Sequence, residues 1–173
     1  LLCICAMIAM ATLLAGCGSS EEMEVGPEST GNPTPAKELD EPVSFKDAKL
    51  EGAVRTALEK PEGIITGKEV ASLVELVAED LGIMELSGLE HATNLTKLYL
   101  AGNQVSDLTP LAGLTNLKYL NLVGNRVTDA RPLAKLTSLR ELWLVGNEIA
   151  DGQQAMLKTA LPRCEIKFWF GEF

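Results

Sequence analysis

An internal repeat of 22 residues constrains the fold of this chain more than any other feature of its sequence. The segments 92–113, 114–135 and 136–157 superpose without a gap, and the first two are identical at twelve of 22 positions. Most of the recurrent positions are apolar, and one asparagine, one glycine and one aspartate also recur in each segment. A repeat of this length predicts supersecondary units that stack and bury a continuous core between neighbours.

The spacing inside each unit predicts its local structure. A Leu-x-Leu step, such as Leu98 and Leu100, indicates a short strand whose alternate side chains point inward, so stacked units form a parallel sheet. In the segment that leads from one strand back to the next, apolar residues recur every three positions. This spacing favours 3₁₀-like turns over a full helix in that segment. Only eight residues of the chain are aromatic, so we expect an aliphatic core.

The recurrent asparagines, Asn103, Asn125 and Asn147, come where each unit must turn. A buried turn leaves backbone groups without a ladder partner, and an amide side chain donates and accepts hydrogen bonds at once. We therefore interpret the three asparagines as a structural ladder between neighbouring turns. A glycine precedes each of them and permits a left-handed backbone there.

The spacing LxxLxLxxNxL resembles the leucine-rich repeat. The segment 22 residues before the first clear repeat follows the same pattern only in part, because Leu81 stands where Asn103 stands in the next repeat. We therefore interpret it as a degenerate first repeat. Stepping forward from Leu142 and Leu144 gives Cys164 and Ile166, so we expect a fifth, closing strand in which Cys164 faces the core. The predicted fold is an α/β leucine-rich repeat solenoid with a parallel sheet of about five strands, a helical N-terminal cap, and a C-terminal helix plus closing strand.

Caps are expected at both ends, because a solenoid end otherwise leaves an apolar face open. Ser44 with Asp47 resembles a capping box for a first helix, and Thr66 with Glu69 resembles one for a second. Asp151 is expected to cap a C-terminal helix that runs to about Leu161. The predicted apolar face of the first helix consists of Leu50, Ala53, Val54, Ala57 and Leu58.

Residues 1–42 differ from the repeats in composition. Residues 1–14 carry no charge and lead into Leu14-Ala15-Gly16-Cys17, which resembles the lipobox of bacterial lipoproteins. This resemblance implies that Cys17 becomes the acylated N-terminus, an ordinary secretory signal being the alternative. Residues 18–42 hold seven acids, one lysine and four prolines and are predicted to be a disordered tether that carries −6 of the net charge of −9.

The predicted organisation has five parts. They are a signal peptide (1–16), the acylated Cys17 with its acidic tether (17–43), an N-terminal cap (44–69), the repeats (70–157) and a C-terminal cap (158–173).

Residues 44–173 are similar to bacterial leucine-rich repeats of internalin type. The resemblance implies a cell-surface recognition module that binds other macromolecules on the exposed, concave face of the sheet. The adhesins of this kind have many more turns than the five predicted here, so adhesin activity does not follow.

Composition excludes several chemistries. A basic nucleic-acid footprint is absent. His91 is the only histidine, so a multi-histidine metal site is impossible and any catalytic triad would need His91 as its base. We expect no enzyme activity, cofactor or metal.

The side chains that flank the inward leucines define the concave face. Its predicted rows are Glu75, Val77 and Glu79; Lys97, Tyr99 and Ala101; Tyr119, Asn121 and Val123; Glu141, Trp143 and Val145; and Arg163, Glu165 and Lys167. Both tyrosines of the chain and one of its two tryptophans fall here. The candidate binding residues are Tyr99, Tyr119, Asn121, Trp143, Lys97, Glu141, Val123 and Val145. The alternative is that these aromatics merely suit strands.

These patterns predict a lipid-anchored, extracytoplasmic protein of the bacterial envelope that binds a protein or peptide without catalysis. A carbohydrate-contacting or purely structural envelope component is the alternative. A membrane is the second expected partner, through the anchor. The oligomeric state stays open, with a monomer as the default expectation.

Overall fold

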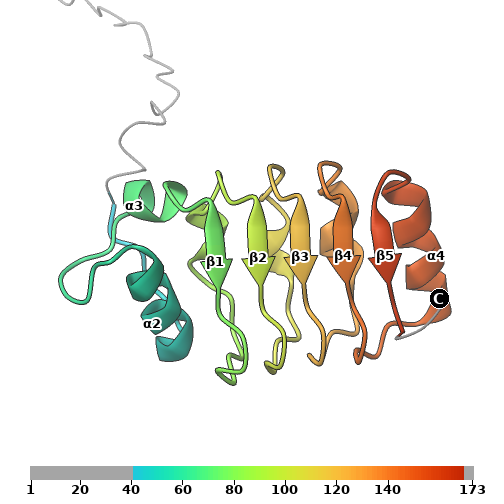
Figure 1. The fold of residues 1–173 in the computed structure, drawn as a ribbon, viewed down its shortest axis with the longest axis horizontal. Coiled ribbons are helices and arrows are strands. Elements are labelled where there is room, and N and C mark those ends of the chain that lie inside the picture. The colour runs from blue at the N-terminus through green and yellow to red at the C-terminus, as the bar shows by residue number, and fades with distance from the viewer. Residues whose placement is uncertain (1–40, 170–173) are drawn as a thin grey trace, which may run out of the picture. The chain divides into compact units, whose positions relative to one another are not determined.

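The structure, a computed structural model, describes residues 41–169. Five short parallel strands lie side by side in chain order, and the segments that join them return on the other side of the sheet (Figure 1). The strands are β1 (Glu75–Val77), β2 (Lys97–Tyr99), β3 (Tyr119–Asn121), β4 (Glu141–Trp143) and β5 (Glu165–Lys167). The predicted short solenoid with a parallel sheet is confirmed.

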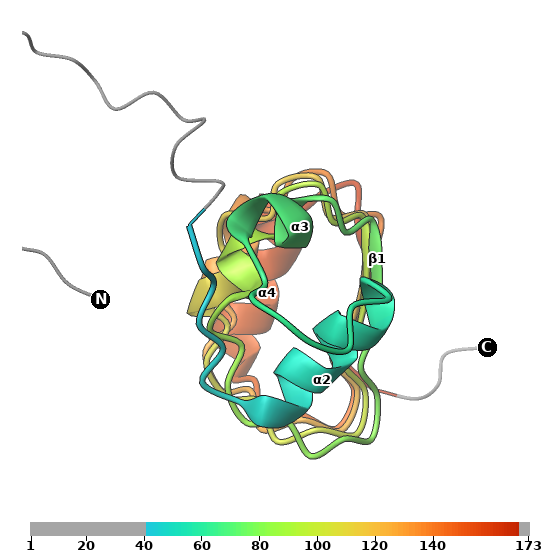
Figure 2. The ribbon, with the colours of Figure 1, turned by 90° about the vertical axis from the view of Figure 1, so that its left-hand side faces the viewer.

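The core is a set of aliphatic columns, one side chain per turn. Leu76, Leu98, Leu120 and Leu142 pair in register across the first four strands and are fully buried. Each such leucine contributes about 1.5–3 kcal/mol through the apolar surface it removes from water. Viewed along the stack, successive turns superimpose, with β1 on one side and the returning segments on the other (Figure 2).

The return segments contain single 3₁₀ turns, as the three-residue period predicts. They are η1 (Leu89–His91), η2 (Thr109–Leu111) and η3 (Arg131–Lys135). The Asp107 carboxylate accepts a hydrogen bond from the backbone N–H of Thr109 (2.8 Å), and that of Asp129 accepts one from Arg131 (3.0 Å). At η2 and η3 these recurrent aspartates therefore satisfy an N–H group that the turn leaves without a backbone partner.

The asparagine amides bridge consecutive turns. Asn125 Nδ2 donates to the carbonyl oxygens of Leu100 (2.8 Å) and Leu122 (3.1 Å), and its Oδ1 accepts from the backbone N–H of Val105 (3.0 Å). Asn103 and Asn147 make the equivalent bonds one turn earlier and one turn later. Each amide thus satisfies backbone groups of its own turn and of the turn before it.

The N-terminal cap packs α2 (Ala48–Ala57) against the first repeat. Ser44 is not its cap: Asp47 is, and its carboxylate accepts from the N–H groups of Lys49 (2.9 Å) and Leu50 (3.4 Å). The same carboxylate accepts from Met84 N–H (2.8 Å), which ties the helix start to the turn after β1. Burial opposes ionisation of Asp47, but these backbone donors outweigh it and hold its pKa below the ordinary value.

The apolar face of α2 is narrower than predicted. Leu50, Ala53 and Val54 are buried, whereas Ala57 is exposed and Leu58 is only half-buried. Ala57 is the last residue of the helix, and the C-cap residue Leu58 still packs partly buried against the core.

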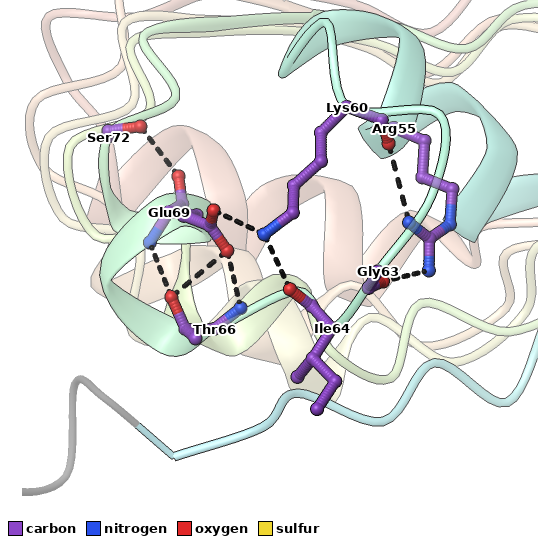
Figure 3. Close-up of polar contacts among 7 residues, drawn as sticks. All are labelled: Arg55, Lys60, Gly63, Ile64, Thr66, Glu69 and Ser72. Carbon is purple, nitrogen blue, oxygen red and sulfur yellow. Dashed lines mark hydrogen bonds and ion pairs between the residues drawn. The ribbon is translucent and has the colours of Figure 1, made fainter.

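The loop after α2 is held by polar contacts around Glu69 (Figure 3). Thr66 and Glu69 form the predicted capping box at the start of α3 (Gly67–Ala71). Lys60 Nζ lies 2.6 Å from Glu69 Oε1 and donates to the carbonyl of Ile64 (2.6 Å). The hydrogen bond from Lys60, followed by that from the Thr66 backbone, lowers the pKa of Glu69 to about 2.

The predicted tether is too long at its C-terminal end. Val43 N–H donates to the carbonyl of Ile65 (2.8 Å), and Gly67 N–H donates to that of Glu41 (3.0 Å). Pro42 and Thr66 form an antiparallel bridge between these bonds. Glu41–Val43 is therefore ordered against the cap, because its backbone groups find partners there. The signal peptide, Cys17 and the tether up to residue 40 lie outside the described residues.

The last turn departs from the period of 22. Helix α4 (Asp151–Ala160) replaces the 3₁₀ return, and β5 pairs Ile166 with Leu142, an offset of 24 residues. The predicted register, with Cys164 opposite Leu142, is wrong by two residues, because an α-helix rises less per residue than a 3₁₀ turn and the return needs more chain.

Two further details of this C-terminal end differ from expectation. Asp151 is the first residue of α4 and not its cap, since the N-cap is Ala150. Cys164 precedes β5 and is half-buried against the core. This burial, followed by the charges of Glu141 and Glu165, raises the pKa of its thiol to about 11.

The ladder generates a first prediction. Replacing Asn125 by Ala leaves buried turn groups unpaired and should destabilise the protein by about 1–3 kcal/mol. The exposed Arg126 has no side-chain bond in the described structure, so Arg126→Ala should change stability by less than about 0.5 kcal/mol. Thermal or urea unfolding of the two variants measures the difference, and equal stabilities would refute the ladder.

Candidate binding face

The concave face is the side of the sheet turned away from the leucine columns. The strand pairing places its residues in rows that cross all five strands. One row is Glu75, Lys97, Tyr119, Glu141 and Glu165, and the next is Val77, Tyr99, Asn121, Trp143 and Lys167. Glu79, Ala101, Val123 and Val145 recur just beyond the ends of the first four strands.

The structure brings together seven of the eight predicted face residues. Tyr99, Tyr119, Asn121 and Trp143 are half-buried on the strands, and Val123 is half-buried beyond β3. Lys97 and Glu141 are exposed.

Val145 is the exception, because it is only 5% exposed and belongs to the core. The prediction that it contacts a ligand is therefore wrong. Val145 lies beyond β4, and the register of the last strand pair carries the bulky Phe168 and Trp169 to that end of the sheet.

The centre of the face is aromatic. The rings of Tyr99 and Tyr119, on neighbouring strands, have centroids 4.9 Å apart and planes inclined by 38°. Trp143 follows on β4, separated from Tyr99 in its row by Asn121. Aromatic pairs of this geometry are rigid and amphipathic, which suits them to contact a partner at small entropic cost.

The charged residues of the face fall into two groups. Lys97 Nζ lies 3.3 Å from Glu75 Oε2, and Lys167 Nζ lies 2.6 Å from Glu165 Oε1. Neither Glu79 nor Glu141 forms an ion pair with another residue of the range 41–169.

The exposed Glu79 instead accepts a long hydrogen bond, in which Asn121 Nδ2 donates to its Oε1 over 3.3 Å. The two residues lie two strands apart, and the small Ala101 lies between their strands. The sequence placed Glu79 on the face but showed no reason for this contact, which depends on the row positions of all three residues.

The corrected register of β5 changes the charge of the face. The period of 22 would place Arg163 beside Glu141, but the structure pairs Glu141 with Glu165 and leaves Arg163 in the turn before the strand. Four carboxylates and two lysines therefore lie on the strands and their ends, and the face is acidic.

His91 lies half-buried in η1, away from the sheet. Its neighbour Glu90 accepts a hydrogen bond from Gly88 N–H (2.7 Å), so this carboxylate serves the turn and does not orient the imidazole. Within residues 41–169 no three His, Cys, Asp or Glu side chains group closely enough to hold a metal ion. No helix of that range is long and apolar enough to cross a membrane.

Comparison with known proteins agrees with this geometry. A family model described as leucine-rich repeats in two copies matches residues 93–128 and 115–151. This match shows that the chain is a leucine-rich repeat protein. No curated protein sequence matches the chain.

Solved structures define the type of repeat. An internalin, InlF, from Listeria monocytogenes is 30% identical with a TM-score of 0.68, over 82% of this chain and 40% of its own length. Internalin InlC2 from the same organism is 28% identical with a TM-score of 0.56, over 82% and 70%. The functional domain of InlJ, also from Listeria monocytogenes, is 27% identical with a TM-score of 0.62, over 70% and 26%.

The chain is accordingly an internalin-like leucine-rich repeat protein of bacterial type. It spans less than half of InlF, so it corresponds to a part of that larger protein.

Tyr119 offers a second prediction. Burial, followed by the charges of Tyr99, Glu141 and Glu79, raises the pKa of its hydroxyl, because a phenolate there is poorly solvated and repelled by the carboxylates. In a Tyr99→Phe background Tyr119 is the one tyrosine left, and its absorbance titration should have a midpoint above the ordinary 10.0. Adding Glu141→Gln removes a negative charge and should lower that midpoint.

Glu62→Gln provides the control, since Glu62 lies in the exposed loop after α2. It should leave the Tyr119 midpoint unchanged. If Glu141→Gln has no larger effect than Glu62→Gln, Glu141 does not face the tyrosine pair.

Proposed function

We propose that this protein is a lipid-anchored, non-catalytic binding module of the bacterial cell envelope that takes a protein or peptide ligand on its concave face. The observation that carries the proposal is the aromatic centre of the face, formed by Tyr99, Tyr119 and Trp143 on three consecutive strands. Tyr and Trp are enriched among the residues that dominate binding energy at interfaces. Folds of internalin type generally bind protein ligands, which supports a polypeptide as the partner.

The size of the face limits the ligand. Five strands at about 4.8 Å spacing, each offering about three residues at about 3.3 Å rise, give a few hundred Å². A standard interface takes about 800 Å² from each partner, so the sheet alone is too small for tight binding of a large globular protein. A short peptide segment fits the area, and the loops after Asn103, Asn125 and Asn147 can extend the contact.

A glycan is the alternative ligand, because sugar rings also stack on exposed aromatic side chains. Affinity capture from envelope extracts with the whole chain, in parallel with a Tyr119→Ala, Trp143→Ala double variant, separates the two. Material that the wild type retains and the double variant loses should be sensitive to protease. Sensitivity to glycosidase alone would favour the glycan, and identical retention by both proteins would exclude the face.

A third prediction follows for a captured ligand. Trp143→Ala and Tyr119→Ala should each lose more than about 1 kcal/mol of binding free energy, since central aromatic contacts dominate small interfaces. The Tyr99→Ala loss should be next in size. Arg131→Ala, on the return side in η3, should leave binding unchanged. Titration calorimetry measures all four, and a harmful Arg131→Ala beside silent Trp143→Ala and Tyr119→Ala would place the site elsewhere.

The envelope location rests on the sequence before the described residues. Leu14-Ala15-Gly16-Cys17 has the small residues and the cysteine of a lipobox, directly after an apolar run. The acidic stretch that follows is too polar to form a core of its own. A flexible chain of this length has a reach of about 25–30 Å, enough to hold the repeats clear of lipid headgroups.

The anchor generates a fourth prediction. Cys17→Ser removes the acylated residue and should release the mature protein from the membrane, because two or three acyl chains are needed for stable attachment. Cell fractionation after detergent-free lysis, followed by immunoblotting, measures the distribution. Cys164→Ser is the matched control and should leave attachment unchanged. Mature Cys17→Ser protein that stays with the membrane would contradict the lipoprotein assignment.

A further inference from the structure

We infer that the ligand of the concave face is a cationic stretch of polypeptide, with an Arg or Lys side chain seated on the Tyr99–Tyr119 pair between Glu79 and Glu141. This inference rests on the proposed function and adds the chemistry of the partner.

The concave face carries negative charge that its own lysines do not neutralise. Its two lysines, Lys97 and Lys167, are already paired with Glu75 and Glu165. Glu141 has no cationic partner among residues 41–169, and Glu79 has only the neutral amide of Asn121. An incoming cation therefore meets two carboxylates that it does not have to take from another ion pair.

The two unpaired carboxylates, Glu79 and Glu141, lie close to the tyrosine pair. Glu141 pairs in register with Tyr119, on the neighbouring strand β4. Glu79 reaches across β2 to Asn121, in the strand that carries Tyr119. The charges of both glutamates bear on the Tyr119 hydroxyl and help to raise its pKa, which agrees with a negative potential over the tyrosine pair. The two carboxylates thus approach the aromatic pair from opposite sides of β3.

The aromatic rings of the tyrosine pair also attract a cation. A guanidinium or ammonium group is attracted to the face of an aromatic ring by about 0.5–2 kcal/mol, depending on how far it is desolvated. Tyr99 and Tyr119 are half-buried and their ring centroids are 4.9 Å apart, so the exposed parts of both rings lie within reach of one side chain. Aromatic rings next to unpaired carboxylates favour a cation over a neutral or anionic group.

The cations at the rim do not reverse this balance. Lys118 and Arg140 immediately precede β3 and β4 and are exposed at the edge where those strands begin. Neither forms an ion pair with Glu141 in the described structure. Glu79 lies at the opposite edge, after β1, followed directly by the exposed Asp80. An anionic peptide or glycan that covers the tyrosines would be repelled by these carboxylates.

The test uses the whole chain with 3-fluorotyrosine, which gives one ¹⁹F signal for each of the two tyrosines. The probes are three synthetic peptides of equal length, in which the same positions hold arginine, its neutral isostere citrulline, or glutamate. The acidic residues 18–42 can also attract arginine, so only shifts of the tyrosine signals count as binding to the face.

The arginine peptide should shift both signals and bind about tenfold more tightly than the citrulline peptide, with a difference that shrinks at high salt. The glutamate peptide should bind more weakly than either. Glu79→Gln with Glu141→Gln should abolish the preference for arginine, while Glu62→Gln in the exposed cap loop should preserve it. Shifts in the glutamine variants still report the aromatic contact, so a loss of charge selection is distinguished from a loss of folding.

Equal binding of the arginine and citrulline peptides, tighter binding of the glutamate peptide, or no shift with the arginine peptide would overturn the inference. These results would leave a neutral or acidic ligand possible, and the proposed function would stand if such a ligand were lost on Trp143→Ala and Tyr119→Ala. A ligand unaffected by those two substitutions would overturn both.

Discussion

The central turns of this solenoid depend on one interaction, the hydrogen bonds of the asparagine amides Asn103, Asn125 and Asn147 with the backbone of two consecutive turns. A turn beside the leucine columns has N–H and C=O groups that neither water nor a strand ladder can satisfy. Asn125 resolves this by donating to Leu100 and Leu122 and accepting from Val105, and Asn103 does the same one turn earlier. Each amide forms hydrogen bonds with the backbone of the preceding turn as well as with its own turn. These bonds therefore set the spacing between turns while they satisfy the polar groups of the backbone.

The binding face is a consequence of that spacing. Turns held in register align every strand position with its equivalent 22 residues away, so Tyr99 and Tyr119 come into contact from neighbouring rows. The face is also changed where the register fails. Helix α4 lengthens the last return, which pairs Glu165 in place of Arg163 with Glu141 and makes this end of the face acidic. The character of the ligand that we infer thus depends on a departure from the repeat as much as on the repeat.

The fold could be predicted where residue types repeat. Leu98, Leu120 and Leu142 recur at one spacing with one role, and Asn103 and Asn125 combine a turn position with an amide that serves it. The sequence did not predict the contacts that residues make with partners outside the repeat pattern. Asp47 caps α2 while also binding Met84 N–H, a contact across 37 residues that no local pattern encodes. Val145 has the sequence position of an exposed face residue, yet it is buried at the end of the sheet to which the register of β5 brings Phe168 and Trp169.

Native-state hydrogen exchange of the backbone N–H groups of Ile83, Val105 and Val127 tests the central claim most directly. These amides donate to the asparagine side chains of the ladder. The N–H groups of Thr109 and Arg131 donate to the carboxylates of Asp107 and Asp129 on the exposed return side and serve as the comparison. We expect the three ladder amides to exchange only through global unfolding, far more slowly than the comparison pair. Exchange of Val105 as fast as that of Thr109 would show that the ladder does not hold the turns together.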